Sequence, residues 1–328
     1  MQAMVLDQPG QPLTLRTLPD PVPGPGELLL AVSACAVCRT DLQICTGDLA
    51  PRRLPIVPGH QAVGHVIACG EGVSGWQVGD RAGVGWLGAV DGTCRFCQQG
   101  RENLCPQAQF TGWDRPGGYA DRLVVRADFA FPVPANFPDR AAAPLLCAGV
   151  IGYRSLKVAG IEPGERLGLF GFGASASLTI QVARAWGCEV FVFTRNPQEQ
   201  ARARALGASW VGSYDDLPPA PLAAAITFAP AGAVVVAALK AVDRGGTVAI
   251  NAIHLDGIPA FPYQLLWLER SLKSVANFTR QDAREFLELA ARLPIRTEVE
   301  LFPLAAANEA LERLAAGQVR GSALLTVA

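Results

Sequence analysis

The sequence has almost no net charge and no long apolar run. Its 328 residues carry 28 Lys and Arg against 29 Asp and Glu, which gives a formal net charge of -1. A nucleic-acid-binding domain normally carries a clear basic excess, so we expect no nucleic-acid partner. The best apolar stretch, Ala231–Leu239, is far shorter than the roughly 20 residues that a membrane-spanning helix needs. We therefore expect no membrane span.

The beginning of the chain, MQAMVLDQPGQPL, shows no charged leader followed by an apolar core, and we therefore expect a cytoplasmic protein. Nine cysteines in a reducing compartment do not predict a disulfide framework, because thiols stay free there. Their clustering favours metal binding instead. The length suggests about two domains, each large enough to bury a substantial core.

The expected secondary structure changes in character near Pro163. Before that point, short apolar runs at 27–34, 62–69 and 119–125 are separated by Gly and Pro clusters, which is typical of an antiparallel, barrel-like domain. After it, strands alternate with helices, which predicts a parallel sheet covered on both faces and an α/β fold class. The expected strands are 166–170, 189–194, 223–228 and 246–251, and the expected helices are 176–186, 198–206, 233–242 and one that Thr279 can cap.

Three cysteines lie close together in the segment DGTCRFCQQGRENLC. Ligands that hold zinc from one loop are spaced so that the backbone can fold around the metal, and Cys94, Cys97 and Cys105 have such a spacing. Asp91 stands three residues before Cys94, and a carboxylate oxygen can complete a tetrahedron. We predict a structural zinc site on these four residues; the alternative is a surface loop whose metal site has been lost.

A second set of zinc ligands is scattered along the chain, with Cys38 in CRTD, His60 in PGHQ and Cys147 in PLLCAG. Two thiolates and one imidazole leave the fourth position of zinc open, and an open position distinguishes a catalytic from a structural site. Taken alone, His60 is more often a satisfied polar residue at a turn, and Cys147 a buried small hydrophobe. The motifs around them favour the metal site.

The segment GFGASA follows an expected strand and opens an expected helix, which is the context that a dinucleotide-binding turn requires. The first glycine permits a tight turn, and the second lets the backbone approach a pyrophosphate. The helix offers N–H groups and the positive end of its dipole to the phosphates. We predict a dinucleotide site on Gly171, Phe172, Gly173, Ala174 and Ser175.

The end of the next expected strand predicts the type of coenzyme. NAD-binding domains usually carry Asp or Glu there to accept hydrogen bonds from the ribose hydroxyls. This chain has Thr194 followed by Arg195. An arginine can pair with the 2′-phosphate of NADP, and such a charge-assisted bond contributes roughly 1.5–3 kcal/mol. We predict a preference for NADP(H) over NAD(H); the alternative is a solvated arginine at a helix start.

Six motifs in a fixed order resemble one family. CRTD, PGHQ, the loop ending in GRENLC, GGYA at Gly117–Ala120, PLLCAG and GFGASA have the order and spacing found in the zinc-dependent alcohol dehydrogenases of the medium-chain dehydrogenase/reductase superfamily. Alcohol dehydrogenase is a standard example of a catalytic zinc held by two cysteines and a histidine, so that association is carried over from the family. The resemblance implies a GroES-like catalytic domain over 1–148 and 277–328, and a Rossmann dinucleotide-binding domain over 149–276.

The resemblance also implies roles for single residues. Zinc on Cys38, His60 and Cys147 would act as a Lewis acid on the alcohol oxygen, while hydride passes to the nicotinamide. Asp41 would orient His60, because a ligating imidazole usually donates its other N–H. Thr40 would relay the proton of the alcohol toward the nicotinamide ribose. The remaining implied roles are pyrophosphate contacts for Arg39 and Arg320, and walls of the substrate pocket for Trp86, Leu87 and Trp113.

The family's pocket suits small or medium alcohols and aldehydes, and its members form homodimers or homotetramers. Three positions depart from the family pattern. Asp91 stands where most relatives have the first structural cysteine, and Gln61 replaces the glutamate that commonly follows the histidine ligand. Gln43 stands where many relatives have a histidine that ends the proton relay, and an amide cannot take up a proton at neutral pH.

Three rival interpretations rest on the same residues. Cys35 and Cys38 form a CxxC pair, but a thiol redox protein would place that pair within a βαβ unit, not in a β-rich region. A zinc-loop or dinucleotide-binding protein without dehydrogenase activity would lack a competent catalytic zinc. A zinc-free quinone or enone reductase of the same superfamily would lack the three-ligand set. His254, after the strand at 246–251, is a further candidate for the nicotinamide side of the site.

Overall fold

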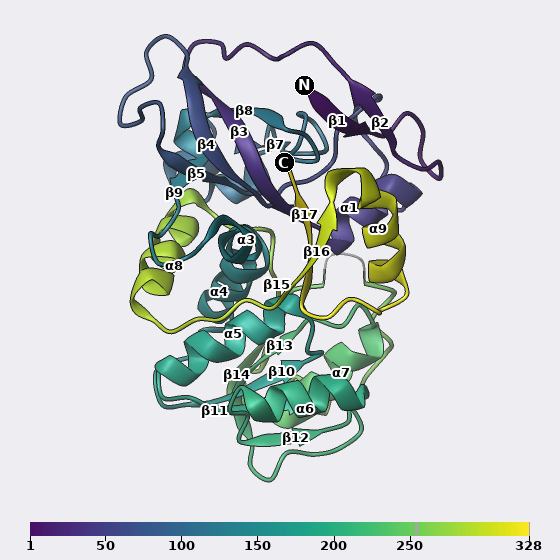
Figure 1. Ribbon diagram of the computed structural model, residues 1–328. Coiled ribbons are helices and arrows are strands. Elements are labelled where there is room, and N and C mark those ends of the chain that lie inside the picture. The colour runs from purple at the N-terminus through teal and green to yellow at the C-terminus, as the bar shows by residue number, and fades with distance from the viewer. Residues whose placement is uncertain (253–254, 328) are drawn as a thin grey trace. The chain divides into compact units, whose positions relative to one another are not determined.

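The computed structural model describes residues 1–252 and 255–327, and Figure 1 traces the chain through them. His254 therefore lies outside the described residues. The chain forms two compact units. Unit 1 comprises Met1–Cys147, Phe278–Arg292 and Arg296–Ala328, and unit 2 comprises Ala148–Asn277 and Leu293–Ile295.

Unit 1 is rich in β structure. Its strands are β1 (Gln2–Val5), β2 (Thr14–Thr17), β3 (Glu27–Ala36), β4 (Ala62–Cys69), β5 (Arg81–Val84), β6 (Leu87–Ala89), β7 (Gln109–Phe110), β8 (Arg122–Arg126), β9 (Ala130–Pro132), β16 (Val299–Pro303) and β17 (Ser322–Thr326). The largest sheet has the order β16-β17-β3-β4-β5-β9, and β8 also pairs with β3. β16 and β17 pair in parallel, whereas β3, β4, β5 and β9 pair antiparallel in succession.

The helices of unit 1 are mostly short. They are α1 (Arg39–Thr46), α2 (Arg95–Gln98), α3 (Asp139–Ala142), α8 (Arg280–Arg292) and α9 (Ala307–Ala315), with 3-10 turns η1 (Glu102–Leu104), η2 (Ala127–Phe129), η3 (Ala143–Leu146) and η5 (Leu304–Ala306). The cap predicted for α8 is confirmed, because the backbone N–H of Asp282 donates to the Thr279 hydroxyl oxygen at 3.1 Å, while the backbone N–H of Thr279 donates to Asp282 Oδ2 at 2.9 Å. Such a bond satisfies a helix-end donor that would otherwise lack a partner.

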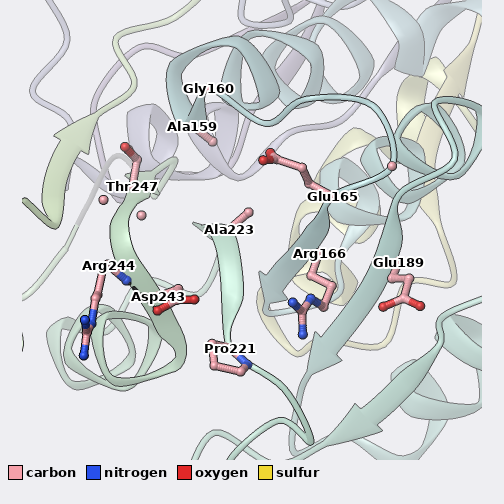
Figure 2. A pocket seen from close by; sticks show the side chains of 13 residues that line it. Ala159, Gly160, Glu165, Arg166, Glu189, Pro221, Ala223, Asp243, Arg244 and Thr247 are labelled. Carbon is pink, nitrogen blue, oxygen red and sulfur yellow. Dashed lines mark hydrogen bonds between the residues drawn. The ribbon is translucent and has the colours of Figure 1, made fainter.

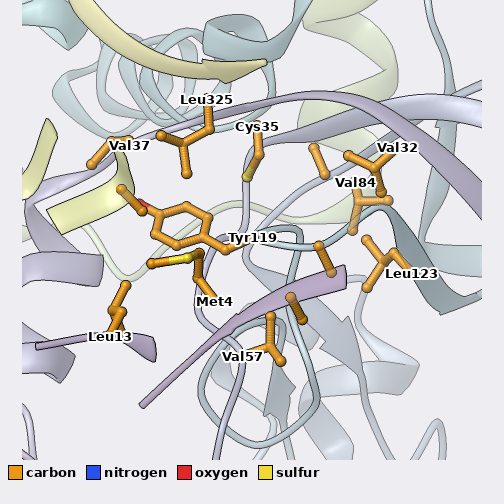
Figure 3. Packing of buried hydrophobic residues seen from close by; sticks show 14 of the residues in the cluster. Met4, Leu13, Val32, Cys35, Val37, Val57, Val84, Tyr119, Leu123 and Leu325 are labelled. Carbon is orange, nitrogen blue, oxygen red and sulfur yellow. The ribbon is translucent and has the colours of Figure 1, made fainter. Parts of the chain in front are cut away.

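The core of unit 1 lies against one face of the large sheet. Along β3, buried side chains at Leu28, Leu30 and Val32 alternate with partly exposed ones, as expected for a strand with one face on a core. Figure 3 shows the Tyr119 ring within this core, near Met4, Val37 and Leu325.

Unit 2 contains one parallel sheet with the order β12-β11-β10-β13-β14-β15. Numbered from its own first strand, this is the order 3-2-1-4-5-6 of a dinucleotide-binding fold, whose switch point lies between β10 and β13. Helices α4, α5, α6 and α7 pack against the strands (Figure 1). The elements are α4 (Ala148–Ala159), β10 (Arg166–Phe170), α5 (Ala174–Ala185), β11 (Glu189–Phe193), α6 (Pro197–Ala205), β12 (Trp210–Gly212), β13 (Leu222–Thr227), α7 (Gly232–Ala241), β14 (Val242–Ile250), η4 (Tyr263–Leu265) and β15 (Ser271–Ser274).

The strands and helices expected after Pro163 are confirmed with ends displaced by a few residues. One strand of unit 1 begins later than expected, at Arg122 in place of Tyr119. The reason is that the backbone N–H groups of Gly117, Gly118 and Tyr119 donate to a neighbouring turn at 57–59 and not to a strand. Among the described residues, no helix is long and apolar enough to cross a membrane.

Candidate metal centres and dinucleotide site

Three distant segments of unit 1 bring Cys38, His60 and Cys147 together. Cys38 is the residue before α1, His60 lies just before β4, and Cys147 directly follows η3. One ligand atom from each of the three lies within 4.8 Å of the others. Two sulfurs and an imidazole nitrogen at such separations are a donor set that suits zinc, and three protein ligands leave one position open.

Asp41 fixes the orientation of the His60 ring. Its Oδ1 lies 2.9 Å from His60 Nδ1, and both side chains are buried, with exposed fractions of 0% and 1%. The backbone N–H of Cys38 donates to Asp41 Oδ2 at 2.8 Å, so the same carboxylate also caps α1. Because Nδ1 is engaged by Asp41, Nε2 is the ring nitrogen that is left to face the two sulfurs.

The three ligand side chains perturb one another's ionisation in the metal-free protein. Burial alone would lower the pKa of His60, but the charge and hydrogen bond of Asp41 raise it to about 10. The hydrogen bond with Cys147, and then the contact with His60, lower the pKa of Cys38 well below its ordinary value. The same hydrogen bond raises the pKa of Cys147. Metal ligands must be deprotonated, so metal binding here has to release protons.

Three polar side chains, Thr40, Gln61 and Gln43, lie near the three ligands in the chain. Thr40 Oγ1 lies 3.8 Å from Cys38 Sγ, and its side chain is largely buried. Gln61, next to His60, is 3% exposed, and its Oε1 has no hydrogen-bond partner among the described residues. Gln43 is partly buried on α1. The neutral amide of Gln61 adds no negative charge next to His60 in the chain.

The second cluster is built within a single loop. Ligand atoms of Asp91, Cys94, Cys97 and Cys105 all lie within 4.8 Å of one another. Cys94 Sγ is 3.6 Å from Cys97 Sγ, and the Cys105 thiol donates to Asp91 Oδ2 at 3.3 Å. Cys105 is anchored in a small core that contains Leu87, Ala108 and Phe129. Three sulfurs and one carboxylate oxygen can complete a closed tetrahedral zinc site.

Asp91 uses its two oxygens differently. Oδ1 accepts the backbone N–H groups of Thr93 and Cys94, at 2.8 and 2.9 Å, which folds the start of the loop. Oδ2 faces the thiols. The two backbone hydrogen bonds lower the pKa of Asp91 well below its usual value, so the residue is a carboxylate at neutral pH. An aspartate can therefore replace a thiolate here without loss of the local turn.

Aromatic rings extend from the buried histidine toward the surface of unit 1. The Trp86 ring meets the His60 ring edge-on, with centroids 4.8 Å apart. Trp86 stacks on Phe110 at 5.1 Å and on Trp113 at 5.8 Å. The guanidinium of Arg52 covers Trp113 at 4.0 Å from its centroid. Phe110 and Arg52 are additions to the pocket residues expected from the sequence.

Three further residues expected at the site have the following surroundings. Leu87 is buried in the small core beside Cys105 and does not join the aromatic stack. Arg39 is exposed in the first turn of α1. The side chain of Arg320 is 86% exposed and forms an ion pair with Glu298 at 3.0 Å.

The glycine turn of unit 2 has the geometry of a dinucleotide-binding loop. Gly171 has φ 91, and a Cβ there would lie 2.9 Å from the backbone nitrogen of Ala229, so no other residue fits without strain. Gly173 precedes α5, and a Cβ there would meet nothing within 4 Å, which leaves open space over the turn. Ala174 and Ser175 form the first turn of α5, whose N–H groups can receive phosphate oxygens.

A carboxylate that the sequence analysis missed lies at the end of β11. The Thr194 hydroxyl donates to Glu199 Oε2, which reaches back from the first turn of α6. Arg195 is exposed, and its guanidinium lies 5.5 Å from the centroid of the Tyr214 ring. Burial, and then the charge of Glu199, raise the pKa of Tyr214. The end of the strand therefore carries one basic and one acidic group.

A polar hollow of about 750 Å³ opens at the other end of the same strands. Figure 2 shows Glu165, Arg166 and Glu189 at the amino ends of β10 and β11, with Asp243 and Arg244 on β14. Coenzymes of such sheets bind at the carboxyl ends, so this hollow is separate from the dinucleotide turn.

A β-rich unit with a ligand set that suits zinc, and a parallel sheet with a dinucleotide turn, are the two parts of a zinc-binding dehydrogenase fold. Residues 24–135 match the family of alcohol dehydrogenase GroES-like domains, and residues 176–292 match the zinc-binding dehydrogenase family. The chain belongs to the zinc-binding alcohol dehydrogenases of the medium-chain dehydrogenase/reductase superfamily. The predicted GroES-like and Rossmann fold class is thereby confirmed.

Individual relatives are similar over their whole lengths. The chain is 47% identical to a Mycobacterium tuberculosis protein described as a probable alcohol dehydrogenase, AdhA, covering 100% of this chain and 97% of that one. It matches a cinnamyl alcohol dehydrogenase from Sorghum bicolor with a TM-score of 0.92 at 27% identity, over 99% and 97% of the two chains. It also matches a cobalt- and zinc-bound thermostable alcohol dehydrogenase from Pyrobaculum aerophilum with a TM-score of 0.91 at 25% identity, over 100% and 99%.

Proposed function

We propose that the protein is a zinc-dependent alcohol dehydrogenase and aldehyde reductase that transfers hydride between a small or medium alcohol or aldehyde and NADP(H). The observation that carries the proposal is the convergence of Cys38, His60 and Cys147, with Asp41 on the far nitrogen of the imidazole. Neither a zinc-free reductase nor a thiol redox protein needs this set.

When bound, zinc supplies Lewis acidity to the substrate oxygen and the nicotinamide supplies or accepts the hydride. The protein's own residues do the rest. Cys38, His60 and Cys147 hold the ion, and Asp41 keeps His60 aimed at it. The Thr40 hydroxyl, beside Cys38, moves the alcohol proton away from the reacting oxygen. Gln43 cannot accept that proton, so the proton passes to solvent or to another base.

The aromatic stack favours alcohols and aldehydes that carry a flat apolar group. Trp86 meets His60 edge-on and stacks on Trp113, and such ring–ring contacts contribute roughly 0.5–1.5 kcal/mol beyond area burial. The similarity to an enzyme named for cinnamyl alcohol is in line with this substrate class.

The preference for NADP(H) rests on Arg195, which can pair with a 2′-phosphate at the end of β11. Glu199 favours a second candidate, NAD(H), because a carboxylate repels that phosphate and can accept a hydrogen bond from a ribose hydroxyl. The pyrophosphate would lie on Gly171–Ser175, with Arg39 and Arg320 as further contacts.

We further propose that zinc in the loop of Asp91, Cys94, Cys97 and Cys105 has a structural role. The catalytic domain would comprise 1–148 and 277–328, and the coenzyme domain 149–276. A cytoplasmic homodimer or homotetramer remains our expectation. The oligomer is supported by two features of unit 2. β15 is an edge strand, and the rings of Tyr263 and Trp267 are stacked and exposed.

The decisive experiment measures aldehyde reduction with NADPH and NADH over a panel of aliphatic and aromatic aldehydes. We expect a higher kcat/KM with NADPH, lowered by Arg195→Ala and raised by Glu199→Gln. Cys38→Ser should abolish turnover, whereas Cys69→Ser, an exposed cysteine outside both clusters, should not. A clear advantage for NADH in the wild type would refute the NADP(H) proposal, and full activity of Cys38→Ser would refute the catalytic zinc.

A further inference from the structure

The GGYA segment, Gly117–Ala120, has no role in the function proposed so far. Its backbone nevertheless binds the turn that carries His60. The N–H groups of Gly117, Gly118 and Tyr119 donate to the carbonyls of Val57, Gly59 and Pro58, at 2.7, 2.9 and 3.0 Å. Three bonds to three consecutive residues fix the position of the turn that precedes the imidazole.

The two segments are packed so closely that only glycine fits between them. Gly59 has φ 97, and a Cβ there would lie 2.3 Å from a ring carbon of Tyr119. A Cβ on Gly117 would lie 2.2 Å from the carbonyl oxygen of Gly59. Cβ atoms essentially never lie so close to a neighbouring heavy atom, and backbone atoms cannot move aside as the end of a flexible side chain can. The Tyr119 ring therefore determines where the backbone before His60 can lie.

The hydroxyl of Tyr119 reaches the second partner of the imidazole. It donates to Asp41 Oδ2 at 3.2 Å, and both residues have an exposed fraction of 0%. Burial, and then the charge of Asp41, raise the pKa of Tyr119 well above its usual value, so it stays a neutral donor. Figure 3 shows its ring within the buried core that also contains Met4 and Leu325, and this packing restricts the direction of the hydroxyl.

With Tyr119 included, the Asp41 carboxylate has four hydrogen-bond partners. Oδ1 is hydrogen-bonded to His60 Nδ1 and accepts the backbone N–H of Gly59. Oδ2 accepts the backbone N–H of Cys38 and the hydroxyl of Tyr119. An ionised carboxylate offers about four acceptor positions, so this one is saturated without water. A buried hydrogen-bond network in which every group has a partner is rigid. A buried polar atom that loses its partner destabilises the fold, because its lost hydration is no longer compensated.

We propose that Tyr119 is a positioning residue for the metal centre. Its ring and backbone fix the turn before His60, and its hydroxyl fixes the carboxylate that aims the imidazole. This inference rests on the proposed zinc site at Cys38, His60 and Cys147. Tyr119 touches neither metal nor substrate, so its effect reaches them through Asp41 and His60.

The expected effect is on the metal itself. Loss of an outer partner of a metal-bound histidine typically costs 10–100-fold in metal affinity or activity. Tyr119 is one bond further from the metal than Asp41. We therefore expect Tyr119→Phe to accelerate zinc release from this site about 10-fold, the lower end of that range.

The experiment follows zinc release from the full-length holoprotein into an excess of a colorimetric chelator. The slow and fast phases are assigned with Cys38→Ser, which should lack the phase of the three-ligand site. Tyr119→Phe should accelerate that phase alone, and the Asp91 loop serves as an internal control. The ligand-field bands of the cobalt-substituted protein should also shift in Tyr119→Phe.

Leu325→Val is the matched control, because it shrinks the same core without removing a polar group. It should lower the thermal midpoint but leave the release phases and the cobalt spectrum unchanged. The inference is overturned if Tyr119→Phe releases zinc at the wild-type rate and its cobalt spectrum is unchanged. It is also overturned if Tyr119→Phe and Leu325→Val both accelerate the two release phases equally. If wild-type protein has no zinc that Cys38→Ser removes, the proposed function fails along with it.

Discussion

The two candidate metal sites of unit 1 are assembled in opposite ways. Asp91, Cys94, Cys97 and Cys105 come from one loop, and of these four residues only Cys105 is buried. Cys38, His60 and Cys147 come from three separate elements around the buried Asp41. In the loop, we expect the metal and the local fold to depend on each other. At the three-ligand site, the sheet and its core hold the ligands in place before any ion arrives.

This difference explains why one site suits structure and the other chemistry. Four ligands from a short loop close the coordination shell, and their binding energy contributes to the folding of that loop. Three ligands fixed by distant elements leave one position for substrate. Loss of the ion should therefore cost stability at the first site and activity at the second.

The largest expected effect comes from removing one thiolate at each site. Cys147→Ser should lower kcat/KM by about 10³-fold, because a Lewis-acid metal contributes several kcal/mol to the transition state. Cys105→Ser should lower the thermal midpoint and leave kcat of the folded fraction close to wild type. Metal analysis, steady-state kinetics and thermal unfolding of both variants test the comparison. The comparison of the two sites is wrong if Cys147→Ser keeps its activity, or if both variants lose only stability.

The next effect is at Asp41, which supports one site and not the other. Asp41→Asn should lower kcat/KM and zinc affinity by about 10–100-fold, because the imidazole loses the carboxylate that orients it. Asp48→Asn, at an exposed position two residues after the end of the same helix, is the control. Zinc titrations and kinetics check the result. Equal behaviour of the two variants would mean that the buried carboxylate does not support the ligand.

A smaller effect is expected where the loop departs from its family. Asp91→Cys should slow zinc release from the loop, because a fourth soft ligand replaces an oxygen, and each kcal/mol gained raises the midpoint by about 2–4 °C. Asp91→Ala should do the reverse, since it removes the ligand and the cap on Thr93 and Cys94. Chelator competition and calorimetry measure both variants. Identical release from wild type and Asp91→Ala would show that the carboxylate is not a ligand.

The smallest effect is a pH dependence in the zinc-free protein. The folded-state pKa of Asp91 is depressed by its two backbone hydrogen bonds, so folding favours the carboxylate. Its contribution to stability is present above the unfolded value of about 3.9, and it is lost as the pH falls toward the lower folded value. The stability difference between wild type and Asp91→Asn should therefore shrink from pH 6 to pH 3 in urea titrations. A constant difference would contradict this origin.

Local signals in the sequence predicted much of the fold. The parallel sheet followed from apolar runs such as Arg166–Phe170 and from the glycine turn after them, because both depend on neighbouring residues. The loop ligands followed from spacing for the same reason. Cys38, His60 and Cys147 could be grouped only through family motifs, since no local pattern joins residues that far apart.

Contacts between separate elements could not be predicted from local pattern. Glu199 reaches Thr194 because the chain reverses between β11 and α6, which places a helix residue at the end of a strand. Tyr119 was expected to begin a strand, yet its hydroxyl reaches Asp41, 78 residues away in sequence. Leu87 follows Trp86 directly but packs in a different cluster. Each of these depends on three-dimensional packing.

The edge-on contact between Trp86 and His60 has an optical consequence. The indole is a fluorophore, and a ring 4.8 Å from the His60 imidazole, a proposed metal ligand, senses a change in the charge of that imidazole. The emission of Trp86 should therefore change as the site is loaded, and a coloured ion such as cobalt should quench it strongly. Loading of this centre should therefore be visible as a change in tryptophan emission.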